Sequence, residues 1–176
     1  MSIFSKIQAK KPRTNTFDLS HDRKFSCPFG MIVPILVMET VPGDKFHLST
    51  SQLLRFAPLV APVMHQVSVY THFFFVPNRL VWSNWEDFIT GGEDGLDTSV
   101  FPYLETGFTH GVGSIWDYLG LPTDVPDTRV SAIPFAAYQL IYNEYYRDQN
   151  LQTGVGEIAD PVLVDGDNSA NSTLRS

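Results

Sequence analysis

Cations near the amino terminus are the residues of this chain whose types and spacing offer the clearest chemistry. Lys6, Lys10, Lys11 and Arg13 lie within eight positions of one another. Residues 1–24, called the cationic arm below, hold six basic residues and two acids and so carry +4, whereas the rest of the chain carries −11. Each cation that neutralises a phosphate releases a condensed counterion, so such an arm can contact nucleic acid without reading its bases. A solvated terminus that only aids solubility is the alternative, since +4 is a modest charge.

The patterns of known catalytic and metal sites are missing from the sequence. It has no G-x-S-x-G elbow, no H-E-x-x-H pair and no phosphate-binding G-x-x-x-x-G-K-[ST] loop, and its single cysteine, Cys27, excludes an internal disulfide. The five histidines are scattered without ligand spacing, at His21, His47, His65, His72 and His110. "HGVGS" at 110–114 has no preceding strand, and "DGDNS" at 165–169 lacks the glycine and glutamate of a calcium loop. We therefore predict no enzyme, no cofactor and no metal site, and interpret His72 as a partly buried polar residue that needs a partner.

Composition favours one β-rich domain behind the arm. The 176 residues are 43% hydrophobic and 18% charged, which is typical of a folded chain long enough to bury one core. Aromatic residues make up 13%, and the 12 prolines and 12 glycines suit short strands and irregular loops better than a helical bundle. The first residues lack the apolar region of a signal peptide, and no later segment has an apolar run of membrane-spanning length. We therefore predict a protein that is neither exported nor membrane-spanning.

Two stretches have the pattern of β-strands. "FGMIVPILVMETVPGDKFHLS" at 29–49 opens with a run rich in Val and Ile, with Pro34 as a kink or edge position, and breaks at Pro42. "QVSVYTHFFFVP" at 66–77 alternates between two faces that are both largely apolar toward its end, as in a strand covered on both sides. These stretches predict strands in a sandwich, with the phenylalanines at 73–75 filling the space between two sheets.

Three short helices are predicted from serine residues at capping-box spacing: Ser49 with Gln52, Ser83 with Glu86, and Ser114 with Asp117. Glycines at 91–92 and 120 are expected to end the second and third of them. The strongest helix signal is "IPFAAYQLIYNEYYRDQN" at 133–150, with Pro134 in its first turn. Its aromatic residues at 135, 138, 142 and 145 form one stripe, which more often packs than binds a ligand. Residues 93–114 are expected to form a long surface excursion.

The aromatic stretch at 69–92, "VYTHFFFVPNRLVWSNWEDFITGG", leaves two interpretations open. In one, its rings form the binding platform of a β-sandwich module that recognises carbohydrate or protein. In the other, they are wall material of a larger assembly, and its tryptophans fix the following helix against that wall or against a neighbour.

Three stretches together resemble a known family. "FSCPFGMIVPILVMETVPGDKFHLS" at 25–49, the stretch at 69–92 and the one at 133–150 resemble, in the same order, the N-terminal part of the major capsid protein of microviruses. These are small icosahedral single-stranded DNA phages, and the resemblance is to their gokushovirus-like group. It covers the chain from about residue 17 to residue 151.

The resemblance implies a viral jelly roll, a mainly β sandwich of which only the N-terminal strands are present here, with short helices and long insertions between strands. It implies a T=1 icosahedral shell of sixty copies around a circular single-stranded DNA genome, assembled in the cytoplasm of a bacterial host. The family's capsid proteins are several times longer, so we expect these strands alone not to close a core. Residues 1–24 would be an extended basic arm, and residues 25–176 the first part of the jelly-roll domain.

The resemblance also gives the candidate residues their roles. The arm would lie on the inner surface of the shell, where its cations touch packaged DNA, a small internal DNA-binding or scaffold protein, or a neighbouring subunit. The expected DNA contacts are Lys6, Lys10, Lys11 and Arg13. The expected subunit contacts are Phe4, Phe17, Trp82, Trp85, Tyr142 and Tyr145. The acidic body would face outward or sideways and bury its aromatic and proline-rich loops on assembly.

Overall fold

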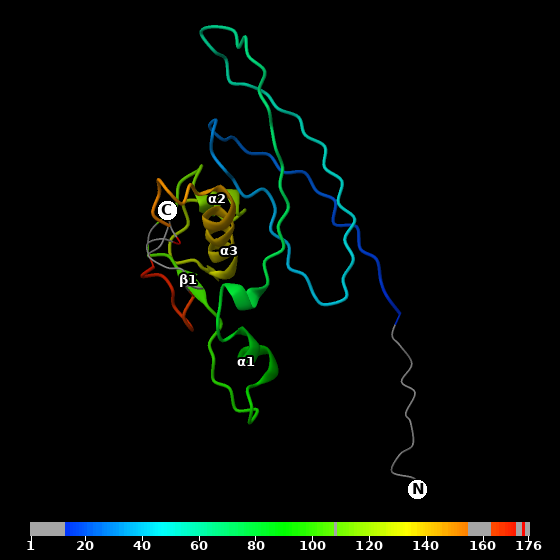
Figure 1. Ribbon diagram of the computed structural model, residues 1–176, viewed down its shortest axis with the longest axis vertical. Coiled ribbons are helices and arrows are strands. Elements are labelled where there is room, and N and C mark those ends of the chain that lie inside the picture. The colour runs from blue at the N-terminus through cyan, green and yellow to red at the C-terminus, as the bar shows by residue number, and fades with distance from the viewer. Residues whose placement is uncertain (1–12, 108, 155–162, 172–173, 175–176) are drawn as a thin grey trace.

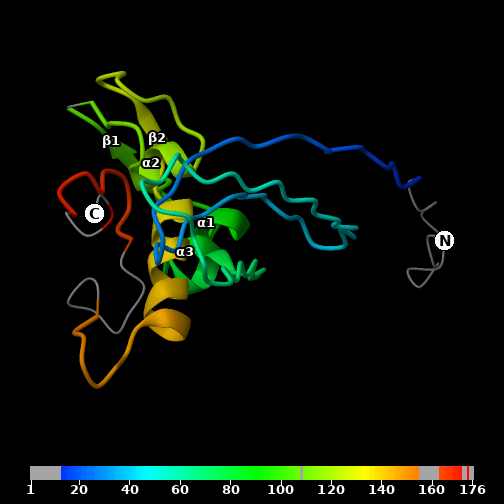
Figure 2. The same ribbon diagram turned by 90° about the horizontal axis from the view of Figure 1, so that it is seen from above.

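The computed structural model describes residues 13–107, 109–154, 163–171 and 174. Its elements, in chain order, are η1 (Asn78–Leu80), α1 (Trp85–Thr90), β1 (Tyr103–Glu105), α2 (Ile115–Tyr118), β2 (Arg129–Ser131), α3 (Ile133–Ile141) and the π-helical turn η2 (Tyr142–Tyr146). They all lie after residue 77, and we call the described residues from 78 onward the helical unit. Residues 13–77, the extended segment, project from the side of this unit opposite residues 163–171 (Figures 1 and 2). No described helix is long and apolar enough to cross a bilayer.

The extended segment contains neither of the two predicted strands as a hydrogen-bonded element. Residues 29–49 and 66–77 run as open chain, apart from two short turns in the first of them (Figure 1). Within the described residues, the stretch 45–76 makes no hydrogen bond between backbone groups. A strand needs a neighbouring strand to satisfy its N–H and C=O groups, and no described segment forms backbone hydrogen bonds of this kind with either stretch. The residue pattern of these two stretches therefore favours strands, but in the described chain they form no hydrogen-bonded ladder.

The prediction of a helix at Ser49 and Gln52 is wrong. Residues 49–59 have no helical turn, and the Gln52 side chain instead donates to the Thr71 hydroxyl. A first helical turn is costly to form, and most short helices depend on packing one apolar face. Leu53 and Leu54 are exposed here, so the cap signal has no packing surface to support it.

The other two capped helices are confirmed, with one change of cap. In α2, the Ser114 hydroxyl accepts a bond from the Asp117 N–H at 3.4 Å, and the Asp117 carboxylate accepts one from the Gly113 N–H at 2.8 Å. α1 begins after Asn84 rather than Ser83 and has no side-chain cap bond. It ends at Gly91, whose φ of 86° lies in the left-handed region that glycine enters without strain.

α3 is also confirmed, and its aromatic stripe runs from core to surface. Pro134 lies in its first turn, and Phe135 is 1% exposed. The helix then widens into η2, where the Arg147 N–H donates to the Tyr142 carbonyl at 2.9 Å, five residues back. At the far end of the stripe Tyr145 is 70% exposed. The expectation that the stripe packs therefore holds for its first half only.

The core of the helical unit joins residues that lie far apart in sequence. Trp82, Leu104 and Phe135 are enclosed together, and Leu163 and Leu174 close the cluster from the carboxyl-terminal side. β1 and β2 form one antiparallel two-stranded sheet, with Leu104 opposite Val130. The described residues thus contain little regular structure, a single small sheet and short helices, where the sequence predicted a mainly β chain.

Candidate subunit and nucleic-acid contact surfaces

The cationic arm is described from residue 13 onward. Phe4 and the cations at 6, 10 and 11 lie outside the described residues. Arg13 is exposed, and Phe17 is 76% exposed. Asp18 accepts bonds from the Ser20 hydroxyl and N–H, and these bonds lower the pKa of its carboxyl group. The described part of the arm is thus an open chain with local side-chain hydrogen bonds (Figure 1).

Residues 23–32, which we call the docking segment, join the arm to the helical unit. Arg23 donates to the carbonyls of Asp117 and Tyr118, the Tyr118 hydroxyl donates to the Ser26 carbonyl at 2.9 Å, and the Tyr138 hydroxyl donates to the Ile32 carbonyl at 2.7 Å. Burial raises the pKa of both tyrosines. Sequence reasoning missed this site, because its partners lie 92 to 106 residues apart and no local pattern links them.

The tryptophans of the 69–92 stretch belong to one aromatic cluster: Trp82, Trp85, Phe88 and Phe101. The Trp82 and Trp85 rings meet edge-on with centroids 6.2 Å apart, and those of Trp82 and Phe88 lie 5.2 Å apart, so that α1 is fixed against the core of the helical unit. Trp82 is 0% exposed, and its indole N–H donates to the Asp165 carboxylate at 2.9 Å. Trp85 is only partly buried. Trp85 therefore lies on the solvent-exposed side of this cluster, whereas Trp82 packs against Trp85 from the core.

The "DGDNS" stretch has a structural role in the fold. Asp165 also accepts bonds from the Asn84 amide at 3.1 and 3.2 Å, and Asp167 accepts from the Ser169 N–H at 2.8 Å. Asn168, which is buried, holds the turn through bonds with the N–H and carbonyl of Val164. Among the residues that the structure describes, no group of three or more metal-ligating side chains comes together.

The predicted hydrogen-bond partner of His72 is present, but the prediction that His72 is partly buried is wrong, because the side chain is exposed. Its Nδ1 is hydrogen-bonded to the Tyr146 hydroxyl, and the two rings stack with centroids 5.8 Å apart. Phe74 contacts Tyr145 at 4.9 Å. Together with Thr71 and Phe73 these side chains line an open groove of about 510 Å³. Tyr142, at the start of η2, donates to the Gln152 side chain at 3.2 Å. The contacts of His72 with Tyr146 and of Phe74 with Tyr145 tie residues 71–74 to η2.

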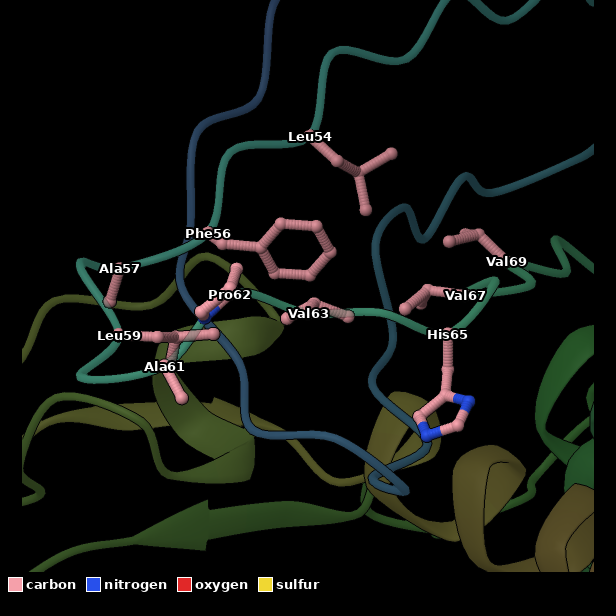
Figure 3. Close-up of a pocket in the computed structure, with 10 residues that line it drawn as sticks. All are labelled: Leu54, Phe56, Ala57, Leu59, Ala61, Pro62, Val63, His65, Val67 and Val69. Carbon is pink, nitrogen blue, oxygen red and sulfur yellow. The ribbon is translucent and has the colours of Figure 1, made fainter.

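A larger apolar groove lies within the extended segment itself. Its lining comes from two arms of one loop, with Leu54 and Phe56 on one and Val63, Val67 and Val69 on the other (Figure 3). Its volume is about 590 Å³, and it opens to solvent. We call residues 53–75 the apolar loop. Its large apolar side chains are exposed almost throughout, and contiguous apolar surface of this kind marks a site of interaction.

Comparisons with known proteins identify the family. The model of the capsid protein (F protein) family matches residues 5–174. The chain is 46% identical over 158 residues to Capsid protein VP1 of Chlamydia phage 1, covering 85% of this chain and 26% of the relative. It is 39% identical over 176 residues to Capsid protein VP1 of Bdellovibrio phage phiMH2K, covering 97% of this chain and 32% of the relative.

A third relative, Capsid protein VP1 of Spiroplasma virus 4, is 30% identical over 148 residues, covering 81% of this chain and 26% of the relative. The chain belongs to the capsid protein (F protein) family, and the resemblance to gokushovirus-like microvirus capsid proteins is confirmed. This is a family of structural virion proteins rather than enzymes. The chain spans between a quarter and a third of the length of these relatives.

Proposed function

We propose that the chain is the N-terminal part of a major capsid protein that self-assembles into a T=1 icosahedral shell around a circular single-stranded DNA genome. The observation that carries this proposal is the family match over residues 5–174, together with 46% identity to the VP1 of Chlamydia phage 1. The partners would be other copies of the same protein, the packaged DNA, and a small internal DNA-binding or scaffold protein where one is present.

The proposed fold of the whole protein is a jelly roll, and the extended segment supports it. Residues 29–49 and 66–77 have the composition of strands, and residues 45–76 have no backbone-to-backbone hydrogen bonds within the described chain. Strands contributed by the rest of the polypeptide would supply those bonds and would cover the apolar loop. Residues 1–24 would then be an arm outside the sandwich, and the body would begin near residue 25.

The proposed role of the arm is contact with packaged DNA on the inner surface of the shell. Its +4 charge against −11 on the remainder supports this role, since DNA phosphates would be repelled elsewhere on the chain. Arg13 is exposed and so available to a phosphate. Phe17 is equally available to stack on a base or to insert into a neighbouring subunit.

The proposed subunit contacts on the body are carried by the exposed edges of two aromatic groups. Trp85 with Phe88 forms one, and Tyr142 with Tyr145 forms the other. Trp82 would take part through the packing of Trp85 rather than by touching the neighbour, because it is fully enclosed. Aromatic residues at such positions are common in the buried centres of protein interfaces.

Full-length protein with the four arm cations Lys6, Lys10, Lys11 and Arg13 changed to alanine tests both parts of the proposal. Electron microscopy reports shells, and absorbance reports the DNA that they contain. We expect shells that hold less DNA. A control with Lys24, Lys45, Arg55 and Arg79 changed to alanine removes the same charge from exposed positions outside the set and should package normally. Unchanged packaging in the arm variant would remove the DNA role, and absence of shells from the parent protein would remove the capsid proposal.

A further inference from the structure

The contacts between the docking segment and the helical unit converge on the carboxyl end of α2. The Arg23 guanidinium donates through Nη2 to the Asp117 carbonyl at 3.1 Å and to the Tyr118 carbonyl. Carbonyls in the last turn of a helix lack the full set of intrahelical donors, and a cationic side chain can satisfy them. No backbone donor reaches the Tyr118 carbonyl among the described hydrogen bonds, so Arg23 fills that position from 95 residues away.

Gly120 provides the space in which the guanidinium lies. Its φ of +86° is left-handed, as expected just after a helix end. A Cβ built on Gly120 would lie 2.9 Å from Arg23 Nη1 and 3.7 Å from Arg23 Cζ. A side chain at this position would be strained by the left-handed φ, and its Cβ would displace the Arg23 guanidinium. The guanidinium is seated against bare backbone.

Tyr118 closes the contact from the opposite direction. Its hydroxyl donates to the Ser26 carbonyl at 2.9 Å, and the Phe25 ring meets its ring edge-on at 6.1 Å. Tyr118 is 4% exposed, so this hydrogen bond is formed away from most of the water. The residue thus acts twice, accepting from Arg23 with its carbonyl and donating to Ser26 with its side chain. Because the two bonds run between different parts of residues 23–26 and one helix end, they fix both position and direction of the chain.

Contacts of the described arm with the helical unit begin at Arg23. Within the described residues 13–22, the hydrogen bonds of side chains stay inside the arm, between Asp18 and Ser20 and between His21 and Leu19. All ten of these residues are exposed. We propose that Arg23, Tyr118 and Gly120 form a latch that sets the point at which the cationic arm leaves the helical unit. Its consequence for DNA rests on the proposed role of the arm; the latch itself does not.

The latch separates two kinds of cation within the +4 arm. Arg23 is committed to protein carbonyls, so it is a positioning residue and not one of the phosphate contacts. The cations that remain start from a fixed origin. An extended chain spans at most roughly 3.3–3.6 Å per residue, so Lys11 can act within about 40 Å of the latch and Lys6 within about 60 Å.

A spin label on Cys27, the one cysteine of these 176 residues, tests the latch in full-length protein in which any cysteine of the remaining polypeptide is replaced by serine. Cys27 is exposed and lies four residues beyond Arg23, so a nitroxide attached to it reports the mobility of the docking segment. We expect an immobilised spectrum in the parent and a mobile one in Arg23→Ala. Lys24→Ala is the matched control, because it removes one positive charge from the adjacent residue, whose side chain is exposed and forms no ion pair within the described chain. This variant should give the same spectrum as the parent. Equal spectra for the two variants would overturn the latch.

Tyr118→Phe keeps the ring and removes only the hydroxyl donor, so it serves if Arg23→Ala fails to fold. The label should then be more mobile than in the parent, with circular dichroism of the helical unit unchanged. A parent-like spectrum in Tyr118→Phe, with the helical unit folded, would contradict a latch that depends on this bond. The hydrogen bond, rather than the packing of the ring, is what this variant measures.

DNA binding separates failure of the latch from failure of the proposed function. For single strands, the slope of log K against log salt concentration becomes shallower by roughly 0.7 for each phosphate that the protein no longer neutralises. We expect Lys11→Ala to reduce the slope by about that amount and Arg23→Ala to leave it unchanged. A shallower slope in Arg23→Ala would make Arg23 a phosphate ligand and overturn the latch. If neither variant changes the slope while the Cys27 label is released by Arg23→Ala, the arm's DNA role fails and the latch remains.

Discussion

The indole of Trp82 is the side chain whose replacement best tests the packing of the helical unit. It is 0% exposed, lies in the shared core and donates to Asp165. Trp82→Phe keeps an aromatic ring but removes the hydrogen bond, worth about 1 kcal/mol net, and leaves a cavity that adds about 1–2 kcal/mol. For a chain of this size each 1 kcal/mol lowers Tm by about 2–4 °C. We therefore expect a fall of roughly 4–12 °C, measured by circular dichroism on protein before assembly.

Trp85→Phe is the matched control, because Trp85 is partly buried and its indole N–H has no hydrogen bond among the described ones. It should lower Tm by no more than about 4 °C, the equivalent of about 1 kcal/mol. A double-mutant cycle with Asp165→Ala isolates the hydrogen bond, and its coupling energy should be about 1 kcal/mol. Equal losses of Tm for the two tryptophan variants, together with a coupling energy near zero, would refute this account of Trp82.

Three further outcomes follow from the described contacts. Phe135→Ala should cost about 3–5 kcal/mol by urea unfolding, because Phe135 is 1% exposed; a cost under about 1 kcal/mol would show that its site collapses freely. Ser114→Ala should cost about 1 kcal/mol because it removes the cap of α2, and Ser114→Asp should restore most of it. Burial raises the pKa of Tyr118 and Tyr138 above the ordinary value of 10.0. Below about pH 10 these tyrosines are protonated in both the folded and the unfolded protein. Above pH 10 they ionise first in the unfolded protein, so the free energy of unfolding should fall as the pH rises toward the pKa values of the folded protein. Tyr118→Phe with Tyr138→Phe should flatten that fall in alkaline unfolding curves, and an unchanged fall would contradict it.

Sequence patterns predicted those elements whose determinants lie within a few residues. The end of α1 at Gly91 and the cap of α2 at Ser114 each depend only on residues of the same turn, and both are present as predicted. Ser49 with Gln52 has the same spacing and gave no helix, because a cap adds about 1 kcal/mol while the packing of an apolar face decides a short helix. Local signals therefore succeed only where the tertiary surroundings agree with them.

The contacts that hold the candidate site together could not have been predicted in this way. Trp82 meets Asp165 across 83 residues, and Arg23 meets Tyr118 across 95. Neither pair can be predicted from periodicity or spacing, because nothing in the sequence distinguishes Asp165 or Arg23 from an aspartate or arginine that has no partner in the fold. For the predicted strands at 29–49 and 66–77, the sequence of each stretch favours a strand, but a β-ladder also needs a second strand. No such pairing occurs among the described residues.

The two strand-forming stretches are nevertheless held at defined positions by one helix. Ile32 is bound by Tyr138 of α3, and His72 is bound by Tyr146 of η2, so the chain between them is a loop closed at both ends. The two tyrosines lie eight residues apart, which is roughly 12 Å along a helix axis. Because both stretches are bonded to tyrosines of one continuous helix, each is held in place without a partner strand of its own.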